Sequence, residues 1–402
     1  KSKRHKLLKN LMNFPVNVME LPSIGKIIDG KVTVDDIMKV SVEDILGRDV
    51  IAPIDSLLNS SVYGKVILVT GAGGSIGSEL CRQIIALMPK TLILYEMNEF
   101  NLYSIEEELL ELDSGIEIVS VLASINDVAC FEKFLINYSV QTVYHAAAYK
   151  HVPMVESNIC SAILNNIIGT YRCVSSSSKC KVEMFMLIST DKAVRPTNVM
   201  GATKRFSELI LQAFNEIVDN STCFSMVRFG NVLDSAGSVV PKFREQIKKG
   251  GPVTVTHPDI YRYFMSIPEA VQLVLQSSGM SKGGDVFLLD MGEPVNIYKL
   301  AENMIFLSGL TPINDKQPDG DISIEITGLR PGEKLCEELL IGEDITGTDH
   351  PRIMRGKEHK LSWKEIKNAI DDFIIYCNHN DEKNALKILK KNVLEYVPNE
   401  FS

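Results

Sequence analysis

Three glycines spaced three residues apart, Gly71, Gly74 and Gly77, stand between an apolar segment and a helical pattern. The segment 65–69 predicts a buried strand, and the residues from 75 onward predict a helix. Such a turn presents backbone N–H groups and a helix N-terminus, which together can bind a pyrophosphate. A glycine-rich loop between any strand and helix is the alternative. The order of strand, turn and helix favours a dinucleotide site, with these residues at the cofactor: Gly71, Gly74, Ser75, Ile76 and Gly77.

A carboxylate follows the next predicted strand at the distance that a dinucleotide site requires. The segment 91–95 is apolar, and Glu96 comes directly after it, 19 residues beyond Gly77. An acidic residue in that place accepts hydrogen bonds from the ribose hydroxyls of the adenosine. The same negative charge would repel a 2′-phosphate, so the sequence favours NAD over NADP. The alternative is an ordinary surface glutamate at the end of a strand.

Small residues follow the fourth predicted strand, 142–144, where His145 is succeeded by three alanines at 146–148. Without bulky side chains, the backbone can approach a flat ring closely. His145 and His151 could serve as general bases, but a packed histidine with one satisfied nitrogen is the more common role. No acidic or cysteine residue stands at metal-ligand spacing around them, which argues against a metal site.

An acidic and a basic side chain stand side by side after the fifth predicted strand, 184–188. They are Asp191 and Lys192, and the helix that follows carries Met200 and Lys204 on one face, four residues apart. A carboxyl and an amine at the carboxyl end of a parallel strand can exchange protons with a bound substrate. A surface ion pair is the alternative. A lysine serves as a base only if burial or neighbouring charges lower its pKa.

The regular alternation of strands and helices from residue 62 onward predicts how these residues are positioned. It indicates an α/β fold, a Rossmann-like doubly wound parallel sheet with a smaller α/β substrate-binding subdomain. In the C-terminal part, Ser362 predicts a helix N-cap, and the run 385–394 predicts a helix that packs or mediates assembly. The predicted domains are a lead-in over 1–60, an NAD-binding domain over 61–232 and a substrate-binding subdomain with C-terminal helices over 233–402, with some crossing of the chain between the last two.

Composition excludes several classes of protein. The chain has 402 residues and a net charge of −9, which argues against nucleic acid as the main partner. Its eight cysteines are scattered without a C-x-x-C pair, which indicates reduced thiols in a cytosolic compartment and no zinc site. No apolar run is long enough to cross a bilayer.

The sequence opens on a basic stretch, 1–9, without an initial methionine. A solvated chain end is one interpretation of this stretch. The other is a juxtamembrane positive patch left after removal of transmembrane helices. The missing methionine favours a cut made in a longer protein.

Taken together, the motifs identify a family. The chain resembles the catalytic domain of the membrane-anchored nucleotide-sugar 4,6-dehydratases, the CapD/WbpM/PglF group of extended short-chain dehydrogenases, which acts on UDP-N-acetylglucosamine. The similarity runs in order from about residue 40 to residue 345. It rests on these stretches: TGAGGSIGSE at 70–79, HAAAYKHVP at 145–153, STDKAVRPTNVMGATK at 189–204, RFGNVL at 228–233, VTHP at 255–258, RYFM at 262–265 and LRPGEK at 329–334.

The resemblance implies a tightly bound, recycled NAD and a reaction in three stages: oxidation at C4, loss of water across C5 and C6, and hydride return to C6, for bacterial glycan biosynthesis. In such a reaction Lys192 would be the C5 base, Asp191 the C6 acid and Thr190 a hydrogen-bonding residue near C4. Ordinary members of the superfamily have a tyrosine where this sequence has Met200, and a thioether cannot act as a base. The C4 hydroxyl proton is then left to Asp191, to a water held by Thr190, or to Lys204, whose usual role is to position the nicotinamide ribose.

The resemblance also assigns binding residues. Arginine forks among them suit a diphosphate. Two positions depart from the family pattern: Ser124 stands where an aspartate often holds the adenine amine, and Asp234 stands where glycine is usual. Besides the glycine turn and Glu96, the cofactor residues are Asn98, Ser124, Ile125, Ala146, Ala147 and Lys204. The residues assigned to the UDP-sugar are Lys150, Asn231, Ser238, Val239, Lys242, Arg262 and Arg330.

The expected partner is therefore a UDP-sugar, with no nucleic acid and no metal. The full-length protein would be membrane-anchored through segments absent from this chain and homo-oligomeric, a dimer or higher. This portion would lie at the cytoplasmic face of the bacterial inner membrane. Two alternatives remain open: a nucleotide-sugar 4-epimerase, which needs the tyrosine that Met200 replaces, and a non-enzymatic NAD-binding scaffold, which gives no reason for an intact Asp191–Lys192 pair.

Overall fold

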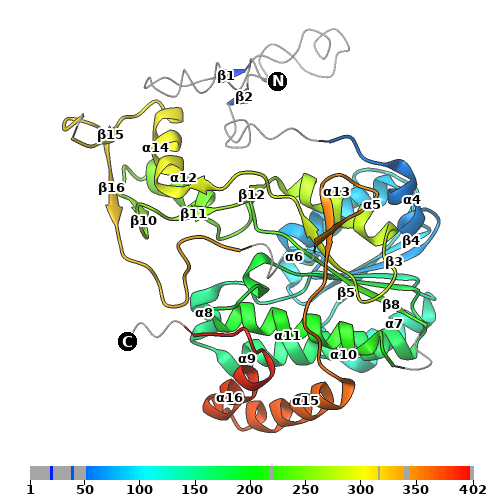
Figure 1. The fold of residues 1–402 in the computed structure, drawn as a ribbon. Coiled ribbons are helices and arrows are strands. Elements are labelled where there is room, and N and C mark those ends of the chain that lie inside the picture. The colour runs from blue at the N-terminus through cyan, green and yellow to red at the C-terminus, as the bar shows by residue number, and fades with distance from the viewer. Residues whose placement is uncertain are drawn as a thin grey trace. The chain divides into compact units, whose positions relative to one another are not determined.

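A computed structural model of the chain describes residues 19–20, 38–39, 51–217, 221–315, 317–338 and 345–398 (Figure 1). In the N-terminal part, β1 (Met19–Glu20) pairs antiparallel with β2 (Met38–Lys39). The expectations for the basic opening fall outside the described residues. Beyond residue 51 the chain forms two compact units, a larger one of Ala52–Gly230, Ile267–Met291 and Pro331–Ser402 and a smaller one of Asn231–Ser266 and Gly292–Arg330.

The larger unit is built on one nine-stranded sheet. Neighbours from β13 to β5 run parallel, whereas β18 is antiparallel to both β13 and β17. The central strands are covered on both faces, so their sequences are continuous apolar runs, such as VILVT in β3, in which every residue is buried. The strands in spatial order are β17 (Ile345–Gly347), β18 (Ile353–Gly356), β13 (Val286–Leu289), β8 (Cys223–Arg228), β7 (Met184–Ile188), β6 (Thr142–His145), β3 (Val66–Thr70), β4 (Thr91–Glu96) and β5 (Glu117–Leu122).

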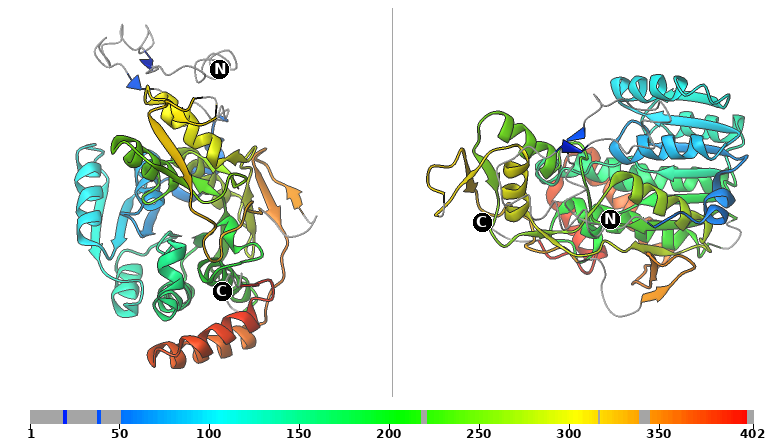
Figure 2. Two further views of the ribbon diagram at one scale, coloured as in Figure 1. Left: turned by 90° about the vertical axis from the view of Figure 1, so that its left-hand side faces the viewer. Right: turned by 90° about the horizontal axis from the view of Figure 1, so that it is seen from above.

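Helices cover both faces of this sheet, which confirms the predicted doubly wound fold (Figures 1 and 2). The strand order reverses direction between β3 and β6, and ligands of such sheets bind at the carboxyl ends of the strands near that reversal. One face carries α5 (Ser75–Ala86), α6 (Glu99–Leu110) and α13 (Ile267–Gly279), with α4 (Asp55–Val62) packed on α13. The other face carries α7 (Val128–Asn137), α10 (Thr170–Lys179) and α11 (Val199–Phe214).

The helix α11 is buried along its whole length because two C-terminal helices pack against it. These are α15 (Trp363–Asn378) and α16 (Glu382–Asn392). As predicted, Ser362 caps α15, and Glu365 completes a reciprocal capping box with it. The predicted domain boundaries group these helices with the substrate-binding subdomain, but their apolar faces pack within the larger unit, where the Phe206 and Phe373 rings meet edge to face at 5.2 Å.

The smaller unit has its own apolar core beneath a short parallel sheet. The chain enters it at Asn231, close to the predicted boundary after residue 232. Phe243 of α12 and Ile305 of α14 are fully buried in this core together with Val253 of β10. Its elements are β9 (Asn231–Val232), α12 (Val239–Lys248), β10 (Val253–Val255), β11 (Tyr261–Arg262), β12 (Phe264–Met265), β14 (Val295–Asn296), α14 (Ile297–Leu307), β15 (Pro312–Ile313) and β16 (Ile322–Ile326).

None of the helices in the described part of the chain combines the length and the apolar composition needed to cross a bilayer. Within the same residues, no group of three or more histidine, cysteine or acidic side chains is arranged to hold a metal ion.

Candidate active site

The predicted glycine turn joins β3 directly to α5 and leaves no room for larger residues. Gly71 has a φ of +66°, a conformation that glycine adopts at no steric cost, and its N–H donates to the Tyr95 carbonyl at 2.8 Å. A Cβ on Gly77 would lie 1.9 Å from the Gly71 carbonyl oxygen. The first turn of α5 is therefore packed against the end of β3. Gly74 is the N-cap of α5 and provides no side-chain cap. The positive end of the helix dipole at this turn favours an anion.

A cavity of about 220 Å³ lies beside this turn, at the carboxyl ends of neighbouring strands in the larger unit. The sequence-predicted residues that line it are Gly71, Gly74, Glu96, Ile125, Ala146 and Ala147. Sequence reasoning missed further lining residues, namely Tyr95, Met97, Asn101, Ala123, Ala148, Tyr149 and Asn165. All of these except Asn101 and Asn165 are within two positions of a predicted cofactor residue. Their places near the ends of predicted strands could therefore have identified them. The predicted cofactor residues that do not line this cavity are Ser75, Ile76, Gly77, Asn98, Ser124 and Lys204.

The carboxylate of Glu96 is held in a fixed position at this cavity. Its Oε2 accepts a hydrogen bond from the Gly73 N–H at 3.1 Å, and its Oε1 accepts from the N–H groups of Met97 and Asn98, both at 2.9 Å. A carboxylate held by three backbone donors loses little side-chain freedom when a ligand arrives. Its remaining acceptor capacity suits a pair of ribose hydroxyls. The cavity, the uncapped helix and this carboxylate together fit the adenosine end of a dinucleotide.

Two of the predicted cofactor residues, Asn98 and Ser124, form local structural hydrogen bonds. The Asn98 side chain accepts from the Asn101 N–H and so caps α6. The Ser124 hydroxyl accepts from the Asn126 N–H at 3.2 Å, and its carbonyl accepts from the Tyr95 hydroxyl at 3.0 Å. Ser124 thus stabilises the turn after β5, whose neighbour Ile125 lines the cavity.

His145 is a packed histidine rather than a base. Its Nδ1 lies 2.8 Å from the Thr70 hydroxyl and its Nε2 lies 3.0 Å from the Thr170 hydroxyl. Burial, assisted by the charge of Lys204, lowers the pKa of His145 to about 3, so the imidazole stays neutral at physiological pH. The histidine therefore connects β3, β6 and α10 at the base of the site.

A π-helical turn, η1 (Ile163–Gly169), positions the segment after β6. Its Asn166 side chain accepts from the Tyr149 N–H at 2.8 Å and donates to the Tyr149 carbonyl at 3.0 Å. The same amide donates to the Thr203 hydroxyl of α11 at 3.0 Å. Such π-helical turns often mark functional sites. Here the turn fixes the 146–149 backbone, which lines the cavity, relative to the helix that carries Met200 and Lys204. Lys150, the next residue, is exposed.

The pair Asp191 and Lys192 lies at the carboxyl end of β7, in the short 3₁₀ turn η2 (Asp191–Ala193). The Lys192 amine is 2.9 Å from Asp191 Oδ1, and the Thr190 hydroxyl donates to the same oxygen at 2.8 Å. The Asp191 side chain is 1% exposed and that of Lys192 is 19% exposed. Asp191 Oδ2 is buried and has no hydrogen-bond partner in the described part of the chain. These exposures exclude the simple surface ion pair that the sequence left open.

Backbone packing holds this pair in place. The Asp191 N–H donates to the Phe229 carbonyl beyond β8 at 3.0 Å, which continues the sheet past its last regular residue. A Cβ on Gly201 would lie 2.1 Å from the Lys192 carbonyl oxygen, so α11 begins in direct contact with the turn. The Asn198 side chain caps α11 by accepting from the Gly201 N–H at 2.8 Å.

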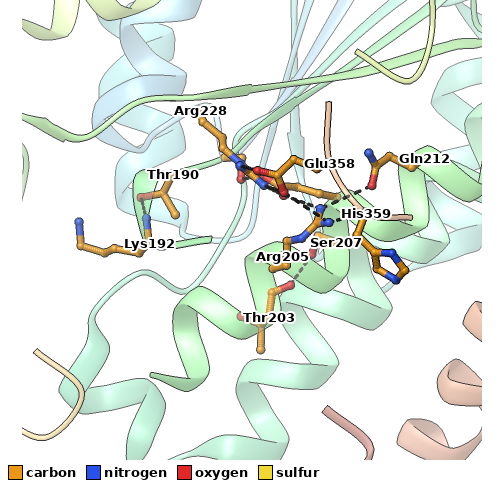
Figure 3. Close-up of polar contacts among 11 residues, drawn as sticks. Thr190, Lys192, Thr203, Arg205, Ser207, Gln212, Arg228, Glu358 and His359 are labelled. Atoms are coloured by element: carbon orange, nitrogen blue, oxygen red, sulfur yellow. Dashed lines mark hydrogen bonds and ion pairs between the residues drawn. The ribbon is translucent and has the colours of Figure 1, made fainter. Parts of the chain in front are cut away.

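A buried ionic network lies behind the pair and connects β7, β8 and α11 (Figure 3). Ser189 donates to Glu208 at 2.6 Å, and Glu208 accepts two hydrogen bonds from Arg228, at 2.5 and 2.7 Å. Glu358 pairs with Arg228 and lies 3.4 Å from Arg205. Burial opposes ionisation of Glu208, but the two guanidinium groups outweigh it and hold its pKa below the usual range. Figure 3 shows the guanidinium groups converging on Glu358 while Lys192 points away from them.

Met200 and Lys204 occupy consecutive turns of α11, as predicted, and both are buried. The Met200 carbonyl accepts from the Thr203 hydroxyl at 2.7 Å, and its thioether offers no proton acceptor of useful strength. Burial lowers the pKa of Lys204 to about 8, against the opposing effect of the Glu208 charge. The neutral amine of Lys204 is therefore accessible near physiological pH.

The residues assigned to the UDP-sugar, apart from Lys150, belong to the smaller unit. Asn231 begins β9, and Ser238 is the N-cap of α12, with a buried hydroxyl that has no partner among the described residues. Val239 opens the same helix, and Lys242 donates to the Thr254 hydroxyl at 2.7 Å. Arg262 lies on β11 and is 8% exposed, and Arg330 follows β16.

Asp234, where the family pattern has glycine, adopts the left-handed conformation with a φ of +56°. Aspartate is among the few non-glycine residues that tolerate this region. Its carboxylate also pairs with Arg244 at 3.0 Å. The departure therefore keeps the backbone conformation for which glycine is usual.

The chain is similar over most of its length to two bacterial polysaccharide biosynthesis proteins. It is 46% identical over 383 residues to "Capsular polysaccharide biosynthesis protein CapD" of Staphylococcus aureus, covering 94% of this chain and 61% of that protein. It is 44% identical over 369 residues to "Probable polysaccharide biosynthesis protein EpsC" of Bacillus subtilis, covering 91% and 60%. The chain thus spans about three fifths of the length of these two relatives. "Uncharacterized membrane protein MJ1061" of Methanocaldococcus jannaschii is 45% identical over 282 residues, which cover 70% of this chain and 82% of that protein.

Solved structures share the fold. Pen from Bacillus thuringiensis superposes with a TM-score of 0.67 at 29% identity, covering 77% of this chain and 98% of that chain. DesIV, a dTDP-glucose 4,6-dehydratase of Streptomyces venezuelae, gives 0.57 at 19% identity, over 68% and 88%. The UDP-glucose 4-epimerase of Thermotoga maritima gives 0.56 at 20% identity, over 68% and 89%. The chain has the fold of the extended short-chain dehydrogenases. Residues 67–358 match the family described as "Polysaccharide biosynthesis protein", and the chain belongs to that family.

Proposed function

We propose that this protein is an NAD-dependent nucleotide-sugar 4,6-dehydratase that converts UDP-N-acetylglucosamine to its 4-keto-6-deoxy derivative. One observation carries the proposal. The chain keeps a buried acid–base pair, Asp191 and Lys192, where the strand β7 ends, and it has Met200 where an alcohol dehydrogenase or an epimerase of this superfamily needs a tyrosine. The site would thus have groups that can move a proton at C5 of the sugar, while it lacks the tyrosine that usually takes the proton of the C4 hydroxyl.

NAD is the cofactor that the larger unit would hold. The glycine turn and the uncapped start of α5 would bind its pyrophosphate, and Glu96 its adenosine ribose. Lys204 would position the nicotinamide ribose. When bound, NAD would supply reversible hydride acceptance, at C4 of the sugar and then at C6. The negative charge of Glu96 disfavours a 2′-phosphate. DesIV was solved with NAD bound, which is a property of that protein and supports the proposal by analogy.

Lys192 and Asp191 would divide the elimination between them. Once C4 is a ketone, the C5 proton is acidic enough for an amine to remove it, and Lys192 Nζ is the partly exposed base. Asp191 would donate a proton to the C6 hydroxyl, which leaves as water. Thr190, whose hydroxyl donates to Asp191 Oδ1, would keep the carboxyl oriented and reach toward C4. The overall redox change is zero, so the cofactor would be retained from one cycle to the next.

The group that removes the C4 hydroxyl proton has three candidates: Asp191, a water held by Thr190, and Lys204. The lowered pKa of Lys204, about 8, supports its inclusion, because a base is most effective when its pKa lies near the working pH. Met200 is not a candidate, because a thioether does not accept a proton at this pH.

Within the smaller unit, Asn231, Ser238, Val239, Lys242, Arg262 and Arg330 would bind the UDP part of the substrate, and Lys150 of the larger unit would reach either the cofactor or the sugar. The capsular polysaccharide role in the name of the S. aureus relative supports a product used in bacterial glycan synthesis. We further propose that the protein is homo-oligomeric and acts at the cytoplasmic face of the membrane. The printed name of the M. jannaschii relative, a membrane protein, supports the membrane association.

The proposed reaction is tested by incubating the protein with NAD and UDP-N-acetylglucosamine in deuterated water. We expect a product lighter than the substrate by one water, with the absorbance of a 4-keto sugar and deuterium at C5. Lys192→Ala should abolish both the product and the label. Lys179→Ala is the matched control, since Lys179 forms an exposed ion pair with Glu132 at 2.7 Å. Formation of UDP-N-acetylgalactosamine would instead identify a 4-epimerase, and cofactor binding without turnover of any UDP-sugar would identify a scaffold.

A further inference from the structure

A second buried carboxylate lies beside the proposed base, and it comes from a distant part of the sequence. Glu337 is 6% exposed, and its Oε1 is 3.9 Å from the Lys192 amine. Asp191 Oδ1 lies 2.9 Å from the same amine. The lysine therefore has two carboxylates within ion-pair distance, one adjacent in sequence and one on the segment that follows Arg330.

The segment that carries Glu337 is attached to the loop after Lys192 at several points. The Gly332 carbonyl accepts hydrogen bonds from the Thr197 hydroxyl at 2.8 Å and from the Asn198 amide at 3.1 Å. The Lys334 amine donates to the Val194 carbonyl at 3.1 Å. Gly332 itself has a φ of +73°, and a Cβ there would lie 2.7 Å from Asn198 Cβ. These contacts fix the segment around Glu337 against the loop after Lys192, and both segments belong to the larger unit.

Charge gives this contact a chemical consequence. A buried carboxylate is costly unless a positive group compensates it. An ammonium between two carboxylates is stabilised relative to the neutral amine, because opposite charges within about 4–6 Å favour the charged form. If Lys192 accepts the C5 proton, as proposed above, an ammonium is what forms during that step. The two carboxylates also orient the amine, and a proton-transfer group acts only when it is held within hydrogen-bond reach of the proton that it takes.

We propose that Glu337 is a positioning residue for Lys192: together with Asp191, its carboxylate holds the amine in the orientation from which the C5 proton is taken. This role rests on the proposed dehydratase function, but the contact between the two side chains can be measured without it. Asp191 supplies the shorter contact and Glu337 the longer one, so loss of Glu337 leaves the lysine in place with one stabilising charge fewer.

The first experiment measures the reactivity of Lys192 in the purified protein without substrate. Trace labelling with acetic anhydride, followed by mass spectrometry, reports how much of the amine is neutral and accessible. Glu337→Gln should raise the labelling of Lys192 roughly tenfold, the scale on which a neighbouring charge shifts a protonation equilibrium, relative to Lys65, which is paired with Glu183 at 2.8 Å. Glu337→Asp keeps the charge and should restore most of the protection. The control is Glu338→Gln, because the Glu338 carboxylate pairs with Arg195 at 2.9 Å instead.

The second experiment follows deuterium incorporation at C5 during turnover. We expect Glu337→Gln to slow it roughly tenfold, less than the contribution of about 10²–10⁴-fold that a positioned proton-transfer group makes as a whole, with KM for the nucleotide sugar unchanged and with partial rescue in Glu337→Asp. Unchanged labelling of Lys192 in folded Glu337→Gln overturns the inference, whatever the enzyme does. Increased labelling with normal C5 exchange overturns the catalytic part of it. If the wild-type protein dehydrates no nucleotide sugar, the proposed function fails, while the labelling result still decides the contact. If the Glu337→Gln protein does not fold, both readouts move to Glu337→Ala, which also removes the carboxylate; unchanged labelling of Lys192 in folded Glu337→Ala overturns the inference.

Discussion

The Ser189 hydroxyl donates a 2.6 Å hydrogen bond to the buried carboxylate of Glu208, which connects the end of β7 to the middle of α11. Glu208 also pairs with Arg228 of β8, so one side chain fixes the relative positions of three elements. Thr190, Asp191 and Lys192 follow Ser189 without interruption. The geometry of the acid–base pair therefore depends on a charge cluster that reaches it through the backbone of Ser189.

Removing the charge of Glu208 should destabilise the fold. Glu208→Gln keeps the shape of the side chain but, among the residues that the structure describes, leaves Glu358 as the one carboxylate paired with Arg205 and Arg228. Breaking a buried ion pair on one side costs about 3–5 kcal/mol in the free energy of unfolding, because an uncompensated charge stays buried. Urea unfolding measures this loss. Glu245→Gln is the control, since its pair with Lys249 is exposed and should leave the midpoint almost unchanged. An equally small effect for both variants would contradict the assignment of Glu208 to a structural network.

The buried amine of Lys204 predicts a stability effect with a defined pH window. Burial lowers its pKa from 10.5 to about 8 in the folded protein. Between these two values the unfolded chain binds the additional proton, so this contribution to stability rises with pH. Below about pH 8 the folded protein holds a charged lysine at a cost on the order of 3 kcal/mol.

Lys204→Met removes that cost. We expect the variant to be more stable than the wild type at pH 7, with a difference that shrinks as pH rises and vanishes near 10.5. Urea unfolding of both proteins at a series of pH values provides the measurement. Lys179→Met, which changes an exposed lysine, should show no such trend. A difference between Lys204→Met and wild type that is constant with pH would argue that the lysine is not desolvated.

The carboxylate of Glu96 should control both the affinity for NAD and the discrimination against NADP. Three backbone N–H groups hold it at the cavity, so its replacement removes a prepositioned acceptor rather than a mobile one. Glu96→Ala should weaken NAD binding at least about tenfold, the value of one or two hydrogen bonds to a charged group. Binding of NADP should weaken less or improve, because the repulsion of its 2′-phosphate is gone. Calorimetric titration with both dinucleotides gives the ratio. Glu99→Ala, three residues along on the exposed start of α6, should change neither affinity.

The sequence predicted the sheet and the strand ends at which the candidate site residues lie, because each of these depends on residues that are close together in the chain. Buried parallel strands read as apolar runs, and the glycines of the turn stand where a side chain would collide with backbone. Glu337 could not be found this way, since its contact with Lys192 joins segments that only the folded chain brings together. The predicted domain boundaries grouped α15 and α16 with the smaller unit for the same reason, whereas they pack in the larger one. The sequence of an amphipathic helix shows which of its faces is apolar but not which surface that face packs against. Here that surface is α11.

Met200 offers the last test, because the family resemblance predicts that it stands in the place of a catalytic tyrosine. The residue is 4% exposed and lies one turn before Lys204. A phenol placed there would therefore be close to this lysine, whose positive charge would favour the phenolate. Two variants separate the effect of the ring from that of the hydroxyl: Met200→Phe fills the space, and Met200→Tyr adds only the acid–base group. If the slot is still directed at C4, Met200→Tyr should exceed Met200→Phe in turnover by at least about tenfold, since a positioned general base contributes about a hundredfold or more in favourable cases. Both variants enlarge a buried side chain, and a shared loss of stability cancels in their ratio. Equal rates in the two folded variants would mean that C4 lies out of reach of this position, and the proton would then be left to Asp191, to a water held by Thr190 or to Lys204.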